Sequence, residues 1–117
     1  MPKSGVGSMA RSEQIPPTKL LMIDIDLDAD KSWLTQYRQN VALVLRSHGL
    51  KATAIRTTPS RNKGYHVRIY LNKPITAHTA NLLQWLLGDD APRVDFNRAR
   101  INAGFDEWNK LFEGPKL

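Results

Sequence analysis

The sequence predicts one small α+β domain in which strands and helices follow the order β-α-β-β-α-β. Two observations lead to this fold class. Three segments alternate apolar and polar residues as half-buried strands do, a fourth is rich in threonine and alanine, and two longer segments repeat apolar residues at helical spacing. Glycine, proline and other turn residues separate these segments. A chain of 117 residues is long enough for a single core of modest size.

The first two elements are a strand and an amphipathic helix. The strand is predicted over residues 19–27, KLLMIDIDL, because its leucines and isoleucines occupy every second position and would share one face. The helix is predicted over residues 32–48, where aromatic and aliphatic residues repeat every three or four positions. Ser32 or Asp30 is available as its N-cap, and Gly49 is a typical C-terminal stop.

The central part of the chain is predicted to form a hairpin and a second helix. Strands are expected over residues 51–60 and 64–72, joined by a polar loop that contains serine, asparagine and glycine. The helix is expected over residues 76–90, with Thr76 as its cap and Gly88 near its end.

Three further segments complete the organisation. Residues 93–97, RVDFN, alternate once more and are expected to form a short fourth strand. Residues 105–114, FDEWNKLFEG, suit either a short helix or an edge strand, and their aromatic side chains are expected to close the core. Residues 1–18 combine Gly, Ser, Pro and charge without periodicity, which predicts a flexible N-terminal tail ahead of one domain over residues 19–117.

This order of elements is that of the ferredoxin-like or RNA-recognition-motif-like fold, in which two helices cover one face of a four-stranded antiparallel sheet. The usual strand order 4-1-3-2 would put the first and third strands at the centre. The helices would bury the apolar face of each strand and leave the opposite face of the sheet open. Polar residues that alternate with the apolar ones are therefore the candidates for a functional site.

Acidic residues of the first strand are expected to meet other polar residues on this open face. Asp24 and Asp26 alternate with isoleucines, so both should point away from the helices. By the same parity, the third strand would present His66 and Arg68, and the fourth would present Asp95. Three carboxylates and one histidine would thus converge from three strands.

A divalent cation is the natural compensation for carboxylates that repel one another. Mg²⁺ or Mn²⁺ takes oxygen ligands, and three aspartates could hold one ion or a pair about 3.5–4 Å apart. The alternative is an acidic surface whose charges are solvated or paired with Arg68, Arg93 and Lys63. Asp28 and Asp30 lie beyond the strand and are assigned to the turn and the helix start.

The hairpin loop carries residues suited to a phosphate group. Backbone N–H groups around Gly64, with Lys63 and Arg61 beside them, could hold a phosphate. His66 could donate a hydrogen bond to it, and Ser60 lies at the start of the loop. The alternative is an ordinary polar hairpin in which His66 is a surface residue.

Composition narrows the classes of function. The chain has no cysteine, which excludes disulfides, thiolate metal sites and cysteine nucleophiles, and its three histidines lack the spacing of zinc ligands. Its 17 Lys and Arg against 11 Asp and Glu give a net charge of +6, which favours a polyanionic partner such as nucleic acid. No apolar run suits a signal peptide or a membrane span, so a cytoplasmic location with no membrane partner is expected.

The motifs MIDID, SRNKGYHV and RVDF resemble those of the archaeo-eukaryotic primase superfamily, the primase-polymerases of archaea, viruses and plasmids. Its pattern is an apolar strand ending in Asp-x-Asp, a Ser-x-His-type strand, and an apolar residue followed by Asp. By this resemblance Asp24, Asp26 and Asp95 would be the catalytic, metal-binding residues. His66 would contact the phosphates of the incoming nucleotide. The further nucleotide-binding candidates are Ser60, Lys63, Arg68 and Arg93.

The resemblance implies a metal-dependent nucleotidyltransferase that acts in DNA replication or repair. Its substrates would be nucleoside triphosphates and its template a single-stranded nucleic acid. One metal ion would activate the attacking 3′-hydroxyl and another would stabilise the departing pyrophosphate. The superfamily's second α/β module has no counterpart here, so a partner protein subunit could complete the cleft. Asp89 and Asp90 are alternatives to Asp95 as the third acid, and strand parity favours Asp95.

Three other functions fit parts of the pattern. A non-catalytic nucleic-acid-binding module on the same fold would present aromatic residues on its central strands, where Tyr70 is the one suitable residue. A rolling-circle nickase needs two histidines separated by one apolar residue and a tyrosine nucleophile, and YHVRI supplies one histidine. A ferredoxin-like interaction protein could pair its carboxylates with arginines of a partner.

Overall fold

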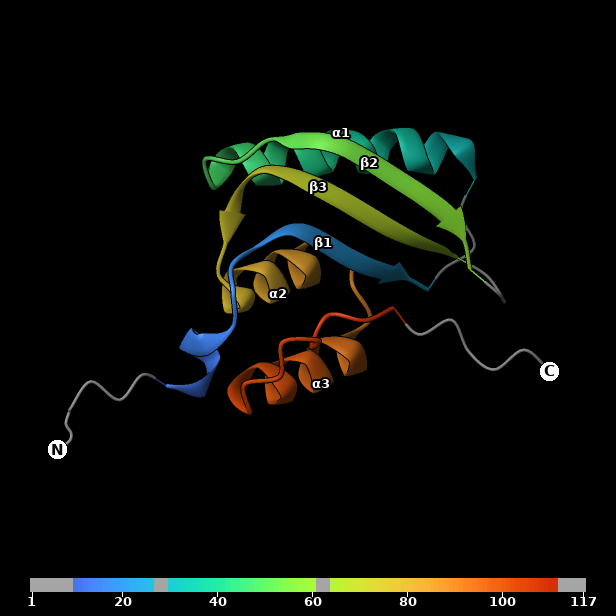
Figure 1. The fold of residues 1–117 in the computed structure, drawn as a ribbon. Coiled ribbons are helices and arrows are strands. Elements are labelled where there is room, and N and C mark those ends of the chain that lie inside the picture. The colour runs from blue at the N-terminus through green and yellow to red at the C-terminus, as the bar shows by residue number, and fades with distance from the viewer. Residues whose placement is uncertain (1–9, 27–29, 61–63, 112–117) are drawn as a thin grey trace, which may run out of the picture.

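The computed structural model describes residues 10–26, 30–60 and 64–111, which form an α+β arrangement (Figure 1). The α+β class predicted from the sequence is confirmed. The elements are the 3₁₀ turn η1 (Arg11–Gln14), the strands β1 (Thr18–Ile25), β2 (Ala52–Pro59) and β3 (Tyr65–Ile75), and the helices α1 (Lys31–Ser47), α2 (Ala77–Leu86) and α3 (Ala91–Asn102).

The sheet formed by the described residues has three antiparallel strands in the order β1-β3-β2. The central strand is β3, so residues on β1 and β2 meet on either side of it. Asp24 of β1 and Thr58 of β2 both pair with His66. The next row across the sheet on the same face consists of Met22, Arg68 and Arg56. This register places the polar residues of three strands in rows on one face.

Helices α1 and α2 begin at side-chain caps that the sequence predicts. The carboxylate of Asp30 accepts a hydrogen bond from the N–H of Trp33 at 2.9 Å, and the hydroxyl of Thr76 accepts one from the backbone one turn into α2. Gly49 and Gly88 follow the two helices with φ angles of 70° and 95°, which glycine adopts without strain. None of the described helices is long and apolar enough to cross a membrane.

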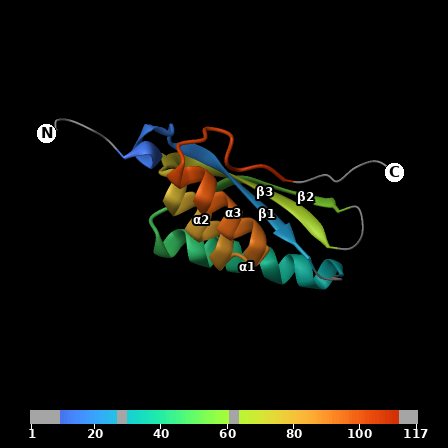
Figure 2. The same cartoon turned by 90° about the horizontal axis from the view of Figure 1, so that it is seen from below.

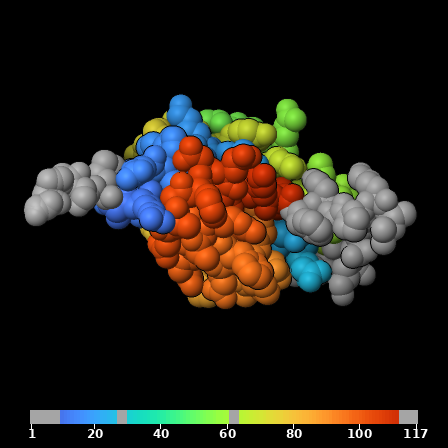
Figure 3. Space-filling view, turned by 60° about the horizontal axis from the view of Figure 1, so that its bottom comes forward, coloured from blue at the N-terminus to red at the C-terminus, as the bar shows by residue number. Residues whose placement is uncertain are grey.

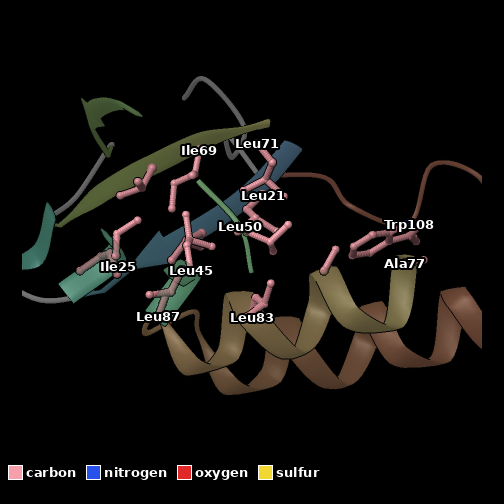
Figure 4. Close-up of a cluster of buried hydrophobic side chains, with 14 of the residues drawn as sticks. Leu21, Ile25, Leu45, Leu50, Ile69, Leu71, Ala77, Leu83, Leu87 and Trp108 are labelled. Atoms are coloured by element: carbon pink, nitrogen blue, oxygen red, sulfur yellow. The ribbon is translucent and has the colours of Figure 1, made fainter. Parts of the chain in front are cut away.

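The core lies between the sheet and the helices, which all lie on one side of it (Figure 2). Leu21, Ile23 and Ile25 of β1 point into this layer, as their alternation predicts. Other members of the core are Val67, Ile69 and Leu71 of β3, Val41 and Leu45 of α1, and Ala80 and Leu83 of α2. Figure 4 shows Ile69, Leu71, Leu45 and Leu83 among them. The opposite face of the sheet therefore carries the polar residues of each strand.

The prediction of a fourth strand over residues 93–97 is wrong. These residues lie within α3, which packs against α2 and has Pro92 in its first turn, where proline favours a helix start. Val94 and Asn97 are buried three positions apart, which is helical spacing, whereas Phe96 is exposed. Five residues are too few to distinguish the alternation of a strand from the repeat of a helix.

Residues 10–18 of the predicted tail over residues 1–18 are part of the fold, since they include η1 and the first residue of β1. Ile15 is buried in the core, and η1 lies against the C-terminal part of the chain, as the blue and orange-to-red surfaces show in Figure 3. Residues 1–9 lie outside the described residues. Residues 10–17 thus belong to the domain.

The C-terminal segment closes the core through one aromatic side chain. Trp108 is 2% exposed and packs in the core, whereas Phe105 is 60% exposed. Residues 105–111 form neither a helix nor a strand, and the rest of the segment predicted over 105–114 lies outside the described residues. The expected closure of the core is therefore confirmed for Trp108 and wrong for Phe105.

Candidate acidic site at the end of β1

Asp24 and His66 lie opposite each other on the open face of the sheet. They are register partners on β1 and β3, and Nε2 of His66 lies 3.7 Å from Oδ1 of Asp24. The histidine side chain is 7% exposed and the aspartate side chain 32%. The predicted juxtaposition of these two residues is confirmed, because the alternation of both strands is the one that the sequence indicates.

Asp24 is a partly buried carboxyl group with charged neighbours of both signs. Burial raises the pKa of Asp24 above its usual value, although the neighbouring His66 acts to lower it. The carboxylate of Asp90 raises this pKa further, Arg93 lowers it, and Asp26 raises it again. An additional positive charge near Asp24 would therefore stabilise its ionised form.

Asp26 and Asp90 join Asp24 at one end of a groove. The groove has a volume of about 690 Å³ and lies between α1 and the end of α2. Asp26 is exposed, and Asp90 is half-buried at the start of α3, where its side chain makes no capping hydrogen bond. We call Asp24, Asp26 and Asp90 the acidic cluster.

Asp95, the preferred third acid, lies away from this cluster. It is on α3, with a side chain that is 72% exposed and pairs with Arg98 at 3.1 Å. The placement of Asp95 on the open face was wrong because it depended on a strand where the chain forms a helix. Of the two alternatives, Asp90 is the one that lies beside Asp24.

Asp89, the other alternative, has a structural role. Its Oδ1 accepts hydrogen bonds from the backbone N–H groups of Asp24 at 2.8 Å and Asp90 at 3.0 Å. Its Oδ2 pairs with Nη1 of Arg93 at 2.6 Å, and the Asp89 side chain is fully buried. Both oxygens are thus engaged within the chain, and Asp89 fixes the backbone of two members of the acidic cluster.

Arg93, predicted to bind phosphate, also has a structural role. Its Nη1 donates to the carbonyl of Met22 at 2.8 Å as well as to Asp89. Its Nε donates to the carbonyl of Lys110 at 3.0 Å, and its Nη2 donates to the side-chain oxygen of Asn109 at 2.9 Å. All three guanidinium nitrogens therefore donate hydrogen bonds within the chain in this structure, and the predicted phosphate contact stays a prediction.

Side chains occupy the edge of β1 where the predicted fourth strand would have paired. Besides the contacts of Asp89 and Arg93, Oε1 of Gln84 accepts hydrogen bonds from the N–H of Met22 at 2.9 Å and from Nδ2 of Asn109 at 2.8 Å. These bonds satisfy backbone groups that an edge strand would otherwise expose. Sequence reasoning missed this role, since no spacing rule identifies side chains that cap a strand edge.

The remaining nucleotide-binding candidates lie around the same face. Arg68 stands between Met22 and Arg56 in its row, and Arg56 is exposed. The backbone N–H of Ser60 donates to the carbonyl of Gly64 at 3.0 Å, which closes the hairpin loop. Lys63 and Arg61 lie outside the described residues.

The acidic cluster offers metal ligands but not a complete coordination set. In residues 10–26, 30–60 and 64–111, no group of three His, Cys, Asp or Glu side chains is arranged to hold a metal ion. Mg²⁺ commonly binds one or two protein carboxylates and completes its shell with water and substrate phosphates. Asp24 and Asp26 alone would therefore leave most of such a shell to water and phosphate.

Comparison with known proteins identifies one uncharacterised viral relative. No protein-family model and no solved structure matches the chain. The chain is 35% identical over 99 residues to "Uncharacterized protein 30" of Sulfolobus islandicus filamentous virus (isolate Iceland/Hveragerdi). The match covers 82% of this chain and 37% of that protein. The chain thus spans little more than a third of the relative's length.

Proposed function

We propose that this chain carries the metal- and nucleotide-binding half of a nucleotidyltransferase of primase-polymerase type that acts in DNA replication or repair. The observation that supports this most is Asp24, which lies 3.7 Å from His66 on the neighbouring strand and lines one groove together with Asp26 and Asp90. The order β1-β3-β2 with helices on one face is compatible with a ferredoxin-like arrangement whose fourth-strand position is filled by side chains.

Asp24 and Asp26 hold Mg²⁺ or Mn²⁺ jointly with the phosphates of a nucleoside triphosphate. A metal held there would favour the ionised form of Asp24, whose pKa burial raises, and would supply positive charge for the phosphates. His66, held 3.7 Å from Asp24 on the central strand, donates a hydrogen bond to the same phosphates. Asp90 lines the same groove and takes the place of Asp95 as a neighbouring acid that is not itself a metal ligand.

The basic row of the open face binds the template strand. Arg56 and Arg68 lie side by side across β2 and β3 and provide cations for the phosphates of a single-stranded nucleic acid. Tyr70, two positions along β3 from Arg68, offers a ring on which a base can stack. A second module completes the cleft. It belongs either to a partner subunit or to additional sequence of the kind that the viral relative has outside the matched 37% of its length.

A Mn²⁺ titration of the isotopically labelled chain tests the site. Mn²⁺ broadens NMR signals only near its binding site, so signals of Asp24, Asp26 and His66 should broaden. The broadening should need at least about tenfold less Mn²⁺ when a non-hydrolysable nucleoside triphosphate is present, because phosphates complete the metal's ligands. Asp24→Asn and Asp26→Asn should abolish this response.

Asp95→Asn is the matched control, since it removes an equally charged but exposed aspartate outside the site. It should leave the broadening unchanged. An undiminished response in Asp24→Asn, or loss of the response in Asp95→Asn, would show that the metal binds elsewhere. A primer-extension assay with wild type and Asp26→Asn then separates catalysis from binding.

A non-catalytic nucleic-acid-binding module is the second candidate function, favoured by the Arg56 and Arg68 row beside Tyr70. If the chain is such a module, EDTA should not weaken the binding of single-stranded DNA to the open face, and the Asp24→Asn substitution should not weaken it either. Arg56→Gln would weaken binding and reduce its salt dependence. Fluorescence anisotropy of a labelled oligonucleotide measures each of these effects.

A further inference from the structure

The helical side of the molecule carries an apolar surface that the described residues leave exposed. We call Leu43, Leu82, Trp85 and Leu86 the apolar patch; their exposed fractions are 57%, 49%, 53% and 47%. Leu82, Trp85 and Leu86 are three and four positions apart on α2, so they share one side of that helix. Leu43 of α1 and Leu86 line the same groove, which joins the two helices into one surface.

The groove beneath this patch has a preformed apolar wall. Trp33 and Tyr37 are stacked along α1, with ring centroids 5.0 Å apart and an interplanar angle of 16°. The Tyr37 hydroxyl donates to the carbonyl of Leu87 at 2.7 Å, which ties α1 to the end of α2. Both rings line the groove, whose volume of about 690 Å³ would accommodate the side chains of a docked helix.

The extent of the patch favours a protein segment over a small ligand. Trp85 and Leu82 lie outside the groove lining and border a second hollow between α2 and α3, together with Arg98. A small molecule filling the groove would leave these two side chains uncovered. A longer helical segment that crosses α2 would cover the groove and both side chains.

The charges of the groove indicate the chemistry of the partner. The charged side chains that line it are all acidic, namely Asp24, Asp26 and Asp90, although the whole chain has a net charge of +6. A partner with a lysine or arginine at one end would complement them, whereas an acidic partner would be repelled.

We propose that the groove between α1 and α2 is the docking site for a basic amphipathic helix of a protein partner. The apolar face of that helix covers Leu43 and Leu86, with Trp85 buried at the side. A lysine or arginine of the partner lies against the acidic cluster. The peptide and the proposed metal share the acidic cluster, but docking through the apolar patch needs no metal and can be tested in its absence.

Three synthetic peptides of about 18 residues test the proposal by isothermal titration calorimetry in EDTA. The first has one leucine face and lysines elsewhere, the second replaces the lysines with glutamates, and the third keeps the lysines but scatters the leucines. The first peptide should bind with a Kd on the order of 10 μM. The second and third should each bind at least about tenfold more weakly, since each lacks one of the two complementary features.

Two single variants and one matched control locate the binding surface. Leu43→Gln on α1 and Leu86→Gln on α2 should each weaken the first peptide by at least about tenfold. Phe105→Gln, which removes an equally exposed apolar side chain outside the groove, should have no effect. Circular dichroism shows whether each variant is folded, and Leu86→Gln should respond to Mn²⁺ and nucleotide as the wild type does.

Three results would overturn the proposal. One is the absence of binding at about 1 mM peptide, a weak limit for a specific site. Another is binding that Leu43→Gln and Leu86→Gln leave unchanged, or that Phe105→Gln weakens equally. The third is self-association of the chain, seen in sedimentation and abolished by Leu86→Gln. The groove would then be occupied by a second copy of the chain.

Discussion

Asp89 and Arg93 form an ion pair of 2.6 Å whose two members also bind the backbone of β1. Asp89 accepts the N–H of Asp24, and Arg93 donates to the carbonyl of Met22, two residues earlier on the same strand. The pair therefore connects the junction of α2 and α3 to the edge of the sheet. The position of Asp24 in the acidic cluster depends on this connection.

Asp89→Ala should destabilise the protein by about 3–5 kcal/mol. The substitution leaves the guanidinium of Arg93 without its carboxylate and the N–H groups of Asp24 and Asp90 without their acceptor. Chemical denaturation followed by circular dichroism measures the free energy of unfolding. NMR signals of Asp24 and Asp90 should shift as well, because both lose a backbone contact.

Asp95→Ala is the control for this measurement, since it also removes one aspartate from an ion pair with an arginine. The pair with Arg98 is exposed, so its loss should cost no more than about 0.5 kcal/mol. Equal costs for the two substitutions would contradict the structural role assigned to Asp89. A large cost for Asp95→Ala alone would show that its pair with Arg98 is more than an ordinary exposed ion pair.

The sequence predicted much of the fold because its signals are local. The helix caps at Asp30 and Thr76 each depend on one side chain and the backbone three residues later. The pairing of Asp24 with His66 depends on strand parity, which two alternating segments define, together with the central position of β3. These features could be predicted without knowledge of the long-range contacts.

The third acid could not be predicted, because its position depends on tertiary packing. Five residues from 93 to 97 alternate as a strand would, yet burial of Val94 and Asn97 against α2 makes them part of a helix. The contacts that hold β1 span about 60 to 70 residues of sequence, from Gln84, Asp89 and Arg93 back to the strand. No local pattern in the sequence signals such contacts.

Trp108→Ala should destabilise the protein by about 3–5 kcal/mol, because it removes a large side chain that is 2% exposed in the core. Phe105→Ala, in the same segment, removes a ring that is 60% exposed and should change stability by no more than about 0.5 kcal/mol. Thermal unfolding of both variants measures the difference. Similar losses for the two would mean that Trp108 does not close the core.

Asp24→Asn should stabilise the protein at neutral pH. The pKa of Asp24 is raised in the folded state, so folding favours its protonated form. The stabilisation by the protonated carboxyl of Asp24 is fully present below the pKa that Asp24 has in the unfolded chain. It is lost as the pH rises through the higher pKa of Asp24 in the folded protein. The neutral asparagine avoids the loss. The melting temperature of the variant should therefore exceed that of wild type at pH 7 and approach it in acid, and a lower value at pH 7 would contradict this account.

The same raised pKa predicts how metal binding depends on pH. Mn²⁺ requires the ionised carboxylate, so its affinity at the acidic cluster should fall as the pH decreases through the pKa of Asp24. This fall should begin at a higher pH than for an ordinary aspartate. Asp90→Asn removes a neighbouring negative charge that raises the pKa, so the midpoint of the fall should move to lower pH.

Mn²⁺ broadening of the Asp24 signal, followed across a pH series, measures the midpoint. Asp95→Asn should leave it in place, because that carboxylate lies on the exposed side of α3 beside Arg98. An Asp90→Asn midpoint equal to that of wild type would separate Asp90 from the site and leave Asp24 and Asp26 as its acids.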